Sequence, residues 1–163
     1  MKTLFSELNG FAIFDPKALL DFKDKHANGN DLLTPLTETD LGDTITADGV
    51  AIPILGVETD DYGFVVSQGE RTYLQEIAVT SKGWVLNATG GLCVCGIGYF
   101  RDFNLERLKE IDRMISFDVP AQWLAIDIYG GYDRNQTPVF EIVYRKVSAK
   151  PNFTGNMSVN YNF

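Results

Sequence analysis

His26 is the only histidine of the chain, and Cys93 and Cys95 are its only cysteines. A Ser–His–Asp or Cys–His centre would have to recruit His26, which lies at the end of a lysine-rich segment where a histidine usually faces water. The cysteine spacing places both thiols on one face of a strand, where a disulfide across one residue would be strained. These three side chains also fall short of a tetrahedral zinc set. We therefore expect no catalytic residues, no metal and no other cofactor.

Carboxylates are the remaining groups that can do chemistry. Asp127 lies in an apolar run where alternation places it on the same face as Trp123 and Tyr129. Glu141 or Arg145 of the next strand-like run is its expected neighbour, and a cross-strand ion pair is the commoner outcome. The rarer outcome is a pocket on the sheet built from Asp127, Glu141, Tyr129 and Trp123. The chain would then be an intracellular small-ligand-binding domain or an enzyme.

Residues 31–61 carry eight carboxylates and no lysine or arginine. The whole chain has 22 acidic and 14 basic residues and a formal net charge of −8, so this acidic stretch accounts for the entire imbalance. Its acids do not follow the spacing of an EF-hand calcium loop. Its leucines and Ile45 are too numerous for a free tail, so we expect a loop tethered to the core with its acids outward. Such a loop is a solubilising segment, a loose cation site or a docking surface for a basic partner.

Charge and hydropathy exclude several classes of partner. A sequence pI near 4.5 argues against direct nucleic-acid binding and against an anionic membrane surface, because both need clustered Lys and Arg. No apolar run has the length of a membrane span. Polar residues interrupt the N-terminal segment, so we expect no secretion signal. Together with two free thiols, this favours a cytoplasmic location.

Two helices are predicted. Asp15 is a suitable N-cap and Pro16 a suitable first residue for a helix that ends at an Asn-Gly pair. The second helix is predicted over residues 103–115, where apolar residues recur every three or four positions, with Asp102 or Asn104 as its cap.

The rest of the pattern predicts strands and turns. Pro53 indicates an edge or a bulge in its strand, and the alternating C-terminal tail predicts a further edge strand. The sum is a single α+β domain over residues 1–163, with a mostly antiparallel sheet of about six strands in a meander and two helices packed on one face. The predicted strands cover residues 50–57, 64–67, 72–79, 84–88 and 92–99, followed by a long hairpin between residues 122 and 147.

These features together resemble the bacterial immunity proteins of polymorphic toxin, contact-dependent inhibition and type VI secretion systems. The resemblance covers size, acidity, the aromatic-rich run "GWVLNATGGLCVCGIGYF" and the lack of a catalytic set. It is a likeness of overall character without a shared motif, so no residue role is taken from it. It implies a cytosolic α+β domain that blocks a cognate toxin, often a basic nuclease.

We therefore expect a non-enzymatic immunity or inhibitor protein that binds and neutralises a basic, nuclease-like protein toxin through an acidic surface. Tyr62 is the expected aromatic anchor. A third hypothesis is a mimic of nucleic-acid charge, which requires carboxylates spaced like phosphates over a long surface. The carboxylates expected to contact the toxin are Glu38, Asp40, Asp43, Asp48, Glu58, Asp60 and Asp61.

Overall fold

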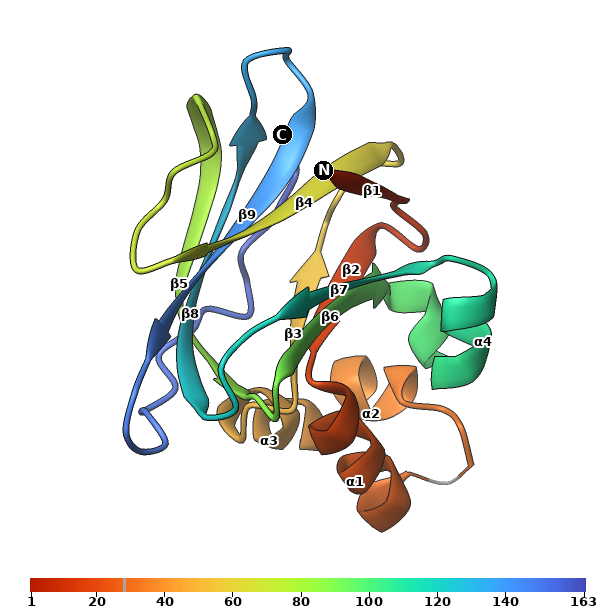
Figure 1. Cartoon of the computed structure of the whole chain (residues 1–163). Coiled ribbons are helices and arrows are strands. Elements are labelled where there is room, and N and C mark those ends of the chain that lie inside the picture. The colour runs from red at the N-terminus through yellow and green to blue at the C-terminus, as the bar shows by residue number, and fades with distance from the viewer. Residues whose placement is uncertain (28) are drawn as a thin grey trace.

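The structure, a computed structural model, describes residues 1–27 and 29–163. The strands in these residues are β1 (Lys2–Phe5), β2 (Gly10–Phe14), β3 (Ala51–Leu55), β4 (Asp61–Gln68), β5 (Glu76–Asn87), β6 (Gly91–Gly96), β7 (Met114–Asp118), β8 (Trp123–Tyr132) and β9 (Pro138–Lys146). They form two sheets that face each other (Figure 1). Sheet A has the order β1-β4-β9-β8-β5, and sheet B has the order β3-β2-β6-β7. Neighbouring strands are antiparallel except β4 and β9, which are parallel.

The helices lie beside sheet B (Figure 1). They are α1 (Pro16–His26), α2 (Leu33–Glu38), α3 (Leu41–Ala47) and α4 (Leu105–Glu110), and η1 (Ile97–Phe100) is a short 3-10 helix. Buried side chains of all these helices pack on the face of sheet B that points away from sheet A. None of the helices in the described residues combines the length and the apolar composition needed to cross a membrane.

This layering creates two apolar cores. The core between the sheets contains Phe11 of β2, Phe64 of β4 and Trp84 of β5, and the rings of Phe11 and Phe64 meet edge to face at 4.9 Å. The core between sheet B and the helices contains Phe14 of β2 and Leu19 of α1. Sheet B is therefore buried on both faces, which explains why its central strands β2 and β6 have almost continuously apolar sequences.

The predicted fold class is confirmed at the coarse level. The protein is α+β, its sheets are rich in antiparallel pairs, and its helices gather on one face of a sheet. The predicted counts are too low, because the described residues form nine strands in two sheets and four α-helices. The prediction missed the short strands β1, β2 and β7, and it could not identify the parallel β4–β9 pair, which joins strands about 75 residues apart.

Both predicted helices form, as α1 and α4, but α4 is shorter than predicted. Asp15 caps α1 by accepting a hydrogen bond from the backbone N–H three residues on, at 2.9 Å, and Pro16 begins the helix. Asn104 caps α4 in the same way at 3.0 Å. This second helix is shorter than predicted, because Asp112 adopts a φ of 53° and Met114 already begins β7.

One predicted turn is a bulge within a strand. The runs 72–79 and 84–88 were expected to be separate strands around Lys82 and Gly83, but a single strand, β5, covers the second half of the first run and most of the second. Its register against β8 shifts at two places, one of them between Ser81 and Trp84, and Gly83 has the positive φ of 85° that such a bulge uses. Pro53 lies in the edge strand β3, as predicted.

The C-terminal tail forms no edge strand in the described residues. It runs instead along the side of the sandwich between β5 and β3, where Thr154 N–H donates to Gly83 O at 3.0 Å and Tyr161 N–H donates to Leu55 O at 3.1 Å. Aromatic side chains of the tail enter the core between the sheets, and Phe163 packs 5.3 Å from Phe140. The alternation that predicted a strand therefore serves to insert side chains into the core.

Candidate functional site

The acidic stretch folds into α2, α3, β3 and the turn that leads to β4. Leu32, Leu36 and Ile45 are buried in the core under sheet B, so the predicted tethering is confirmed. The predicted loop is wrong, because residues 33–38 and 41–47 are helical. Asp31 stabilises the start of α2 by accepting hydrogen bonds from Thr34 and from the N–H of Leu33. These bonds lower the pKa of Asp31, and the bonds from Thr34 have the largest effect.

The seven predicted contact carboxylates are all exposed, but they form two groups at opposite ends of β3. The five residues of this strand separate the groups by about 16 Å. One group lies on α2 and α3, and its Asp48 is already paired with Lys150 of the C-terminal tail. The other group lies in the β3–β4 turn and at the first residue of β4. They do not form the continuous track that a mimic of nucleic-acid charge requires. The α2–α3 group is Glu38, Asp40, Asp43 and Asp48, and the β3–β4 group is Glu58, Asp60 and Asp61.

Tyr62 is not available as a surface anchor. Its side chain is only 1 % exposed and packs in the core between the sheets, with its ring 5.8 Å from that of Phe11. Strand alternation explains the correction, because Tyr62 shares the inward face of β4 with Phe64, whereas Asp61 points outward. Burial raises the pKa of Tyr62, and the nearby charges of Asp60 and Glu58 raise it further.

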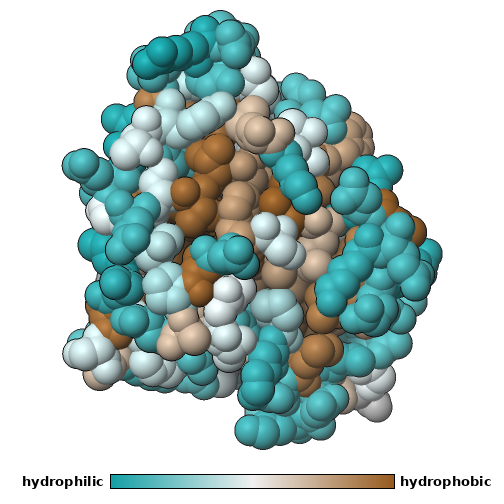
Figure 2. Space-filling view, viewed as in Figure 1, coloured by the Kyte–Doolittle hydropathy of each residue, from teal (hydrophilic) through white to brown (hydrophobic). Residues whose placement is uncertain are grey.

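Two exposed apolar side chains lie on the β1–β2 hairpin, which is attached to the β3–β4 group of carboxylates. Phe5 of β1 is 41 % exposed and lies opposite Asp61 in the β1–β4 register. Leu8, in the following turn, is 61 % exposed, and its side chain lies over Gly98 of η1. Ser6 N–H donates to Asp60 O at 2.9 Å, which ties the β1–β2 hairpin to the acidic turn. Figure 2 shows apolar atoms interleaved with hydrophilic ones at this end of the molecule.

The tip of this hairpin has an unusual backbone. Leu8 and Asn9 have φ values of 53° and 55°, and a bridge between Glu7 and Gly10 closes the two-residue turn. Positive φ at both central positions is the type I′ geometry, for which Asn and Gly are the preferred residues. A leucine there costs about 1 kcal/mol, and its exposed side chain gains little from burial. We call Phe5, Leu8, Glu58, Asp60 and Asp61 the hairpin surface.

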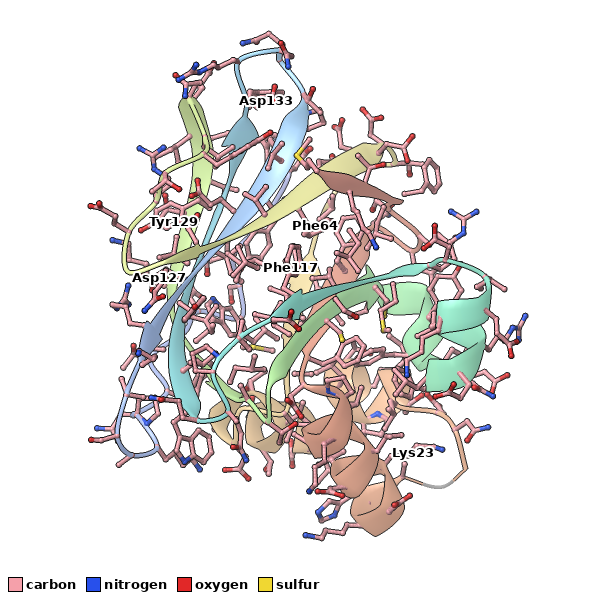
Figure 3. The ribbon with its side chains drawn as sticks, viewed as in Figure 1. Lys23, Phe64, Phe117, Asp127, Tyr129 and Asp133 are labelled. Atoms are coloured by element: carbon pink, nitrogen blue, oxygen red, sulfur yellow. The ribbon has the colours of Figure 1, made fainter. Side chains whose placement is uncertain are left out.

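The alternative pocket on sheet A does not form from the predicted residues. Asp127 is 5 % exposed, and its Oδ2 accepts a hydrogen bond from Arg145 at 2.9 Å, so the cross-strand ion pair is confirmed. Tyr129 lies on the same outer face, with the ammonium of Lys82 5.9 Å from its ring (Figure 3). Neither Asp127 nor Tyr129 lines any of the five principal clefts found in the described residues. Trp123 lines a separate cleft next to His26.

Glu141 has a structural role that the sequence did not suggest. Its side chain is fully buried, yet no cation is paired with it in the described residues. Its two oxygens accept hydrogen bonds from the backbone N–H groups of Thr72, Tyr73 and Leu74 and from the hydroxyl of Ser67, at 2.6 to 3.2 Å. Burial alone would raise the pKa of Glu141, but these hydrogen bonds outweigh it and lower the pKa. Glu141 therefore holds the β4–β5 loop against sheet A as an ionised carboxylate.

The other reactive side chains are engaged in packing. Cys93 and Cys95 are free and buried, and burial raises the pKa of both thiols. The ring of His26 lies 4.8 Å from that of Phe22 at the end of α1, with the two ring planes tilted by 38°. Over residues 1–27 and 29–163, no three His, Cys, Asp or Glu side chains converge in a way that would hold a metal ion.

Comparison with known proteins adds no information about the function of the chain. No protein-family model, curated protein or solved structure matches the chain.

Proposed function

We propose that this chain is a non-enzymatic binding protein that docks a basic protein partner on the hairpin surface and, as the resemblance to immunity proteins suggests, neutralises a toxin. The observation that carries the proposal is the position of Phe5 and Leu8, two exposed apolar side chains on a hairpin that is hydrogen-bonded to the turn with Glu58, Asp60 and Asp61. Protein interfaces combine an apolar centre, which supplies most of the affinity, with a charged rim, which speeds encounter and guides docking.

Two further features support the hairpin surface, rather than the α2–α3 group, as the docking site. The backbone strain at Leu8 lacks a stabilising role within the fold, and such strain tends to occur at functional sites. None of the carboxylates of the β3–β4 turn forms a salt bridge in the described residues, whereas Asp48 of the other group does. The α2–α3 carboxylates then contribute to long-range steering.

The test begins with capture from an extract of the source cells. The bait is the wild-type chain, the triple variant Glu58→Lys/Asp60→Lys/Asp61→Lys, or a control that reverses the exposed Glu70, Glu76 and Asp118. Both triple variants change the net charge by +6 from −8 to −2, so only the position of the charge differs. Mass spectrometry identifies the bound proteins, and the rate of association is then measured with the purified partner at low and high salt.

We expect the wild type and the control to retain one basic protein whose toxic activity is inhibited on binding. The hairpin variant should associate about tenfold more slowly at low salt and should lose most of the salt dependence. The proposal is refuted if the hairpin variant binds the same partner with an unchanged rate and salt dependence, or if the retained partner is acidic.

A further inference from the structure

A second recognition site lies in sheet A, at the β8–β9 turn, away from the hairpin surface. A cleft of about 300 Å³ separates the β4–β5 loop from this turn and is lined by Thr72, Tyr73, Gln75, Asp133, Arg134 and Asn135. Figure 1 shows that the start of β5 and the β8–β9 turn lie next to each other, and Figure 2 shows a hydrophilic surface at this end. Neither the expected pocket on the sheet nor the proposed docking surface includes these residues.

Both walls of the cleft are held by buried carboxylates. Glu141 fixes one wall through the backbone N–H groups of Thr72, Tyr73 and Leu74. Asp133, only 6 % exposed, fixes the other, because its Oδ1 accepts hydrogen bonds from the N–H groups two and four residues on at 2.8 and 3.0 Å. The two loops are joined directly where Gln75 N–H donates to the carbonyl of Tyr132 at 3.0 Å. The cleft is therefore preorganised, which reduces the entropy lost when a ligand binds.

The second oxygen of Asp133 is the feature that points to a ligand. Oδ2 accepts no hydrogen bond from the described residues, although the residue is more than nine-tenths buried and lines the cleft. It is not enclosed, because Ser6 Oγ and Tyr161 Oη are the only enclosed side-chain atoms without a partner in those residues. Oδ2 therefore keeps free acceptor positions on a residue that lines the cleft, and a ligand that carries a hydrogen-bond donor can use them. Figure 3 shows Asp133 at the end of the sheet beside this turn.

The other groups that line the cleft indicate which kind of ligand would carry the hydrogen-bond donor. Arg134 offers donors only, the amides of Gln75 and Asn135 both donate and accept, and Tyr73, 37 % exposed, offers an aromatic face. The charges of Asp133 and Arg134 balance, so the cleft does not favour an ion of either sign. Hydroxyl groups, which donate and accept at once, on a small ring with an apolar face satisfy all of these groups together. The volume lies at the lower end of the range for small-ligand sites.

We infer that this cleft binds a neutral polyhydroxylated ligand, a sugar residue, with Asp133 Oδ2 as the acceptor at its base and Tyr73 as its aromatic wall. The site is independent of the proposed docking of a basic protein, because the two surfaces share no residue.

The test is a titration followed by ¹H–¹⁵N correlation spectra of the full chain. The probes are the methyl glycosides of glucose, galactose, mannose and N-acetylglucosamine, each to about 100 mM because single sugars bind weakly, and N-acetylarginine amide as a cationic comparison. At least one glycoside should give saturable shifts confined to residues 72–75 and 133–137.

Matched variants separate recognition from folding. Asp133→Asn keeps an oxygen for the turn and removes the acceptor in the cleft, so it should weaken binding at least fivefold, as should Tyr73→Ala. Tyr73→Phe and the distant control Asp118→Asn should bind like the wild type. Gln75→Ala, which changes an exposed side chain, provides a third weakening variant. The inference is overturned if no glycoside shifts these amides, if the arginine amide binds them more tightly than every glycoside, or if folded Asp133→Asn and Tyr73→Ala variants bind unchanged.

Discussion

Glu141→Gln is expected to be strongly destabilising, although it is nearly isosteric. The glutamine keeps one oxygen as an acceptor but replaces the other by an NH₂ group, which faces backbone N–H groups of the β4–β5 loop. Leu74 N–H donates only to Oε2, at 3.0 Å, and would lose its partner, whereas Tyr73 N–H donates to both oxygens at 3.1 and 3.2 Å and would keep one of its two bonds. Each unsatisfied buried group costs roughly 1–3 kcal/mol, and bonds to a charged acceptor are stronger than neutral ones. We therefore expect a loss of about 2–4 kcal/mol in the free energy of unfolding.

The pH dependence of this loss follows from the direction of the pKa shift. The pKa of Glu141 is lowered in the folded protein from its ordinary value of 4.5. A carboxylate with a depressed pKa contributes stability above the pKa of the unfolded chain, and this contribution is lost as the pH falls through the folded-state pKa. The difference between wild type and Glu141→Gln should therefore be largest above about pH 5 and should narrow progressively below about pH 4.5.

Urea denaturation at several pH values measures the difference, with Glu76→Gln as the control because that glutamate is exposed at the start of β5. Hydrogen exchange should show that the amides of residues 72–74 lose protection in Glu141→Gln. A destabilisation below about 0.5 kcal/mol with unchanged exchange at these amides would show that the carboxylate does not organise the loop.

The remaining predictions concern stability and are measured by the same denaturation assay. Gly131→Ala should destabilise the protein by more than about 3 kcal/mol, because the added Cβ would overlap a backbone carbonyl of β5. Gly69→Ala should cost only about 1 kcal/mol, because open space surrounds Gly69 and only its positive φ opposes a side chain. Leu8→Asn should stabilise by about 0.5–1 kcal/mol because Asn tolerates the left-handed backbone, and an unchanged or lower stability would show that the turn is not strained. Phe163→Ala should cost about 2–3 kcal/mol, and Met157→Ala in the same tail less than 0.5 kcal/mol; equal effects would show that the tail is not anchored by its aromatic ring.

Elements with a local physical signal were predictable from the sequence. Asp15 followed by Pro16 predicts the start of α1, and Asn104 predicts the start of α4, because capping depends only on neighbouring backbone groups. Asp127 and Arg145 pair as expected from the alternation of a hairpin. The burial of Tyr62 was also available in the sequence, since Tyr62, Phe64 and Val66 alternate along one face of a strand.

Elements without a local signal were not predictable. Helices α2 and α3 contain Thr, Gly and Pro, and neither has a side-chain hydrogen bond from its own N-cap residue. Apart from the local hydrogen bonds that Asp31 accepts at the start of α2, these helices are stabilised by burying Leu36 and Ile45 under sheet B, which is a tertiary effect. The same holds for Glu141, because its hydrogen-bond donors lie about 70 residues away in the chain. Sequence spacing carries no information about such a partnership.

Leu8 offers the clearest way to separate folding from function. Glycine, Asn or Asp occupies most positions of positive φ in the described residues, as Gly83 does in the β5 bulge, and Leu8 and Gln136 are the exceptions. At the tip of the β1–β2 hairpin a bulky apolar residue occupies a position where Asn or Gly would be more stable. A residue that makes the fold less stable and remains 61 % exposed contributes to stability neither by conformation nor by burial. If the hairpin surface binds a partner, Leu8→Asn must raise the free energy of unfolding and weaken binding together. A variant that gains stability and keeps full affinity would remove Leu8 from the interface.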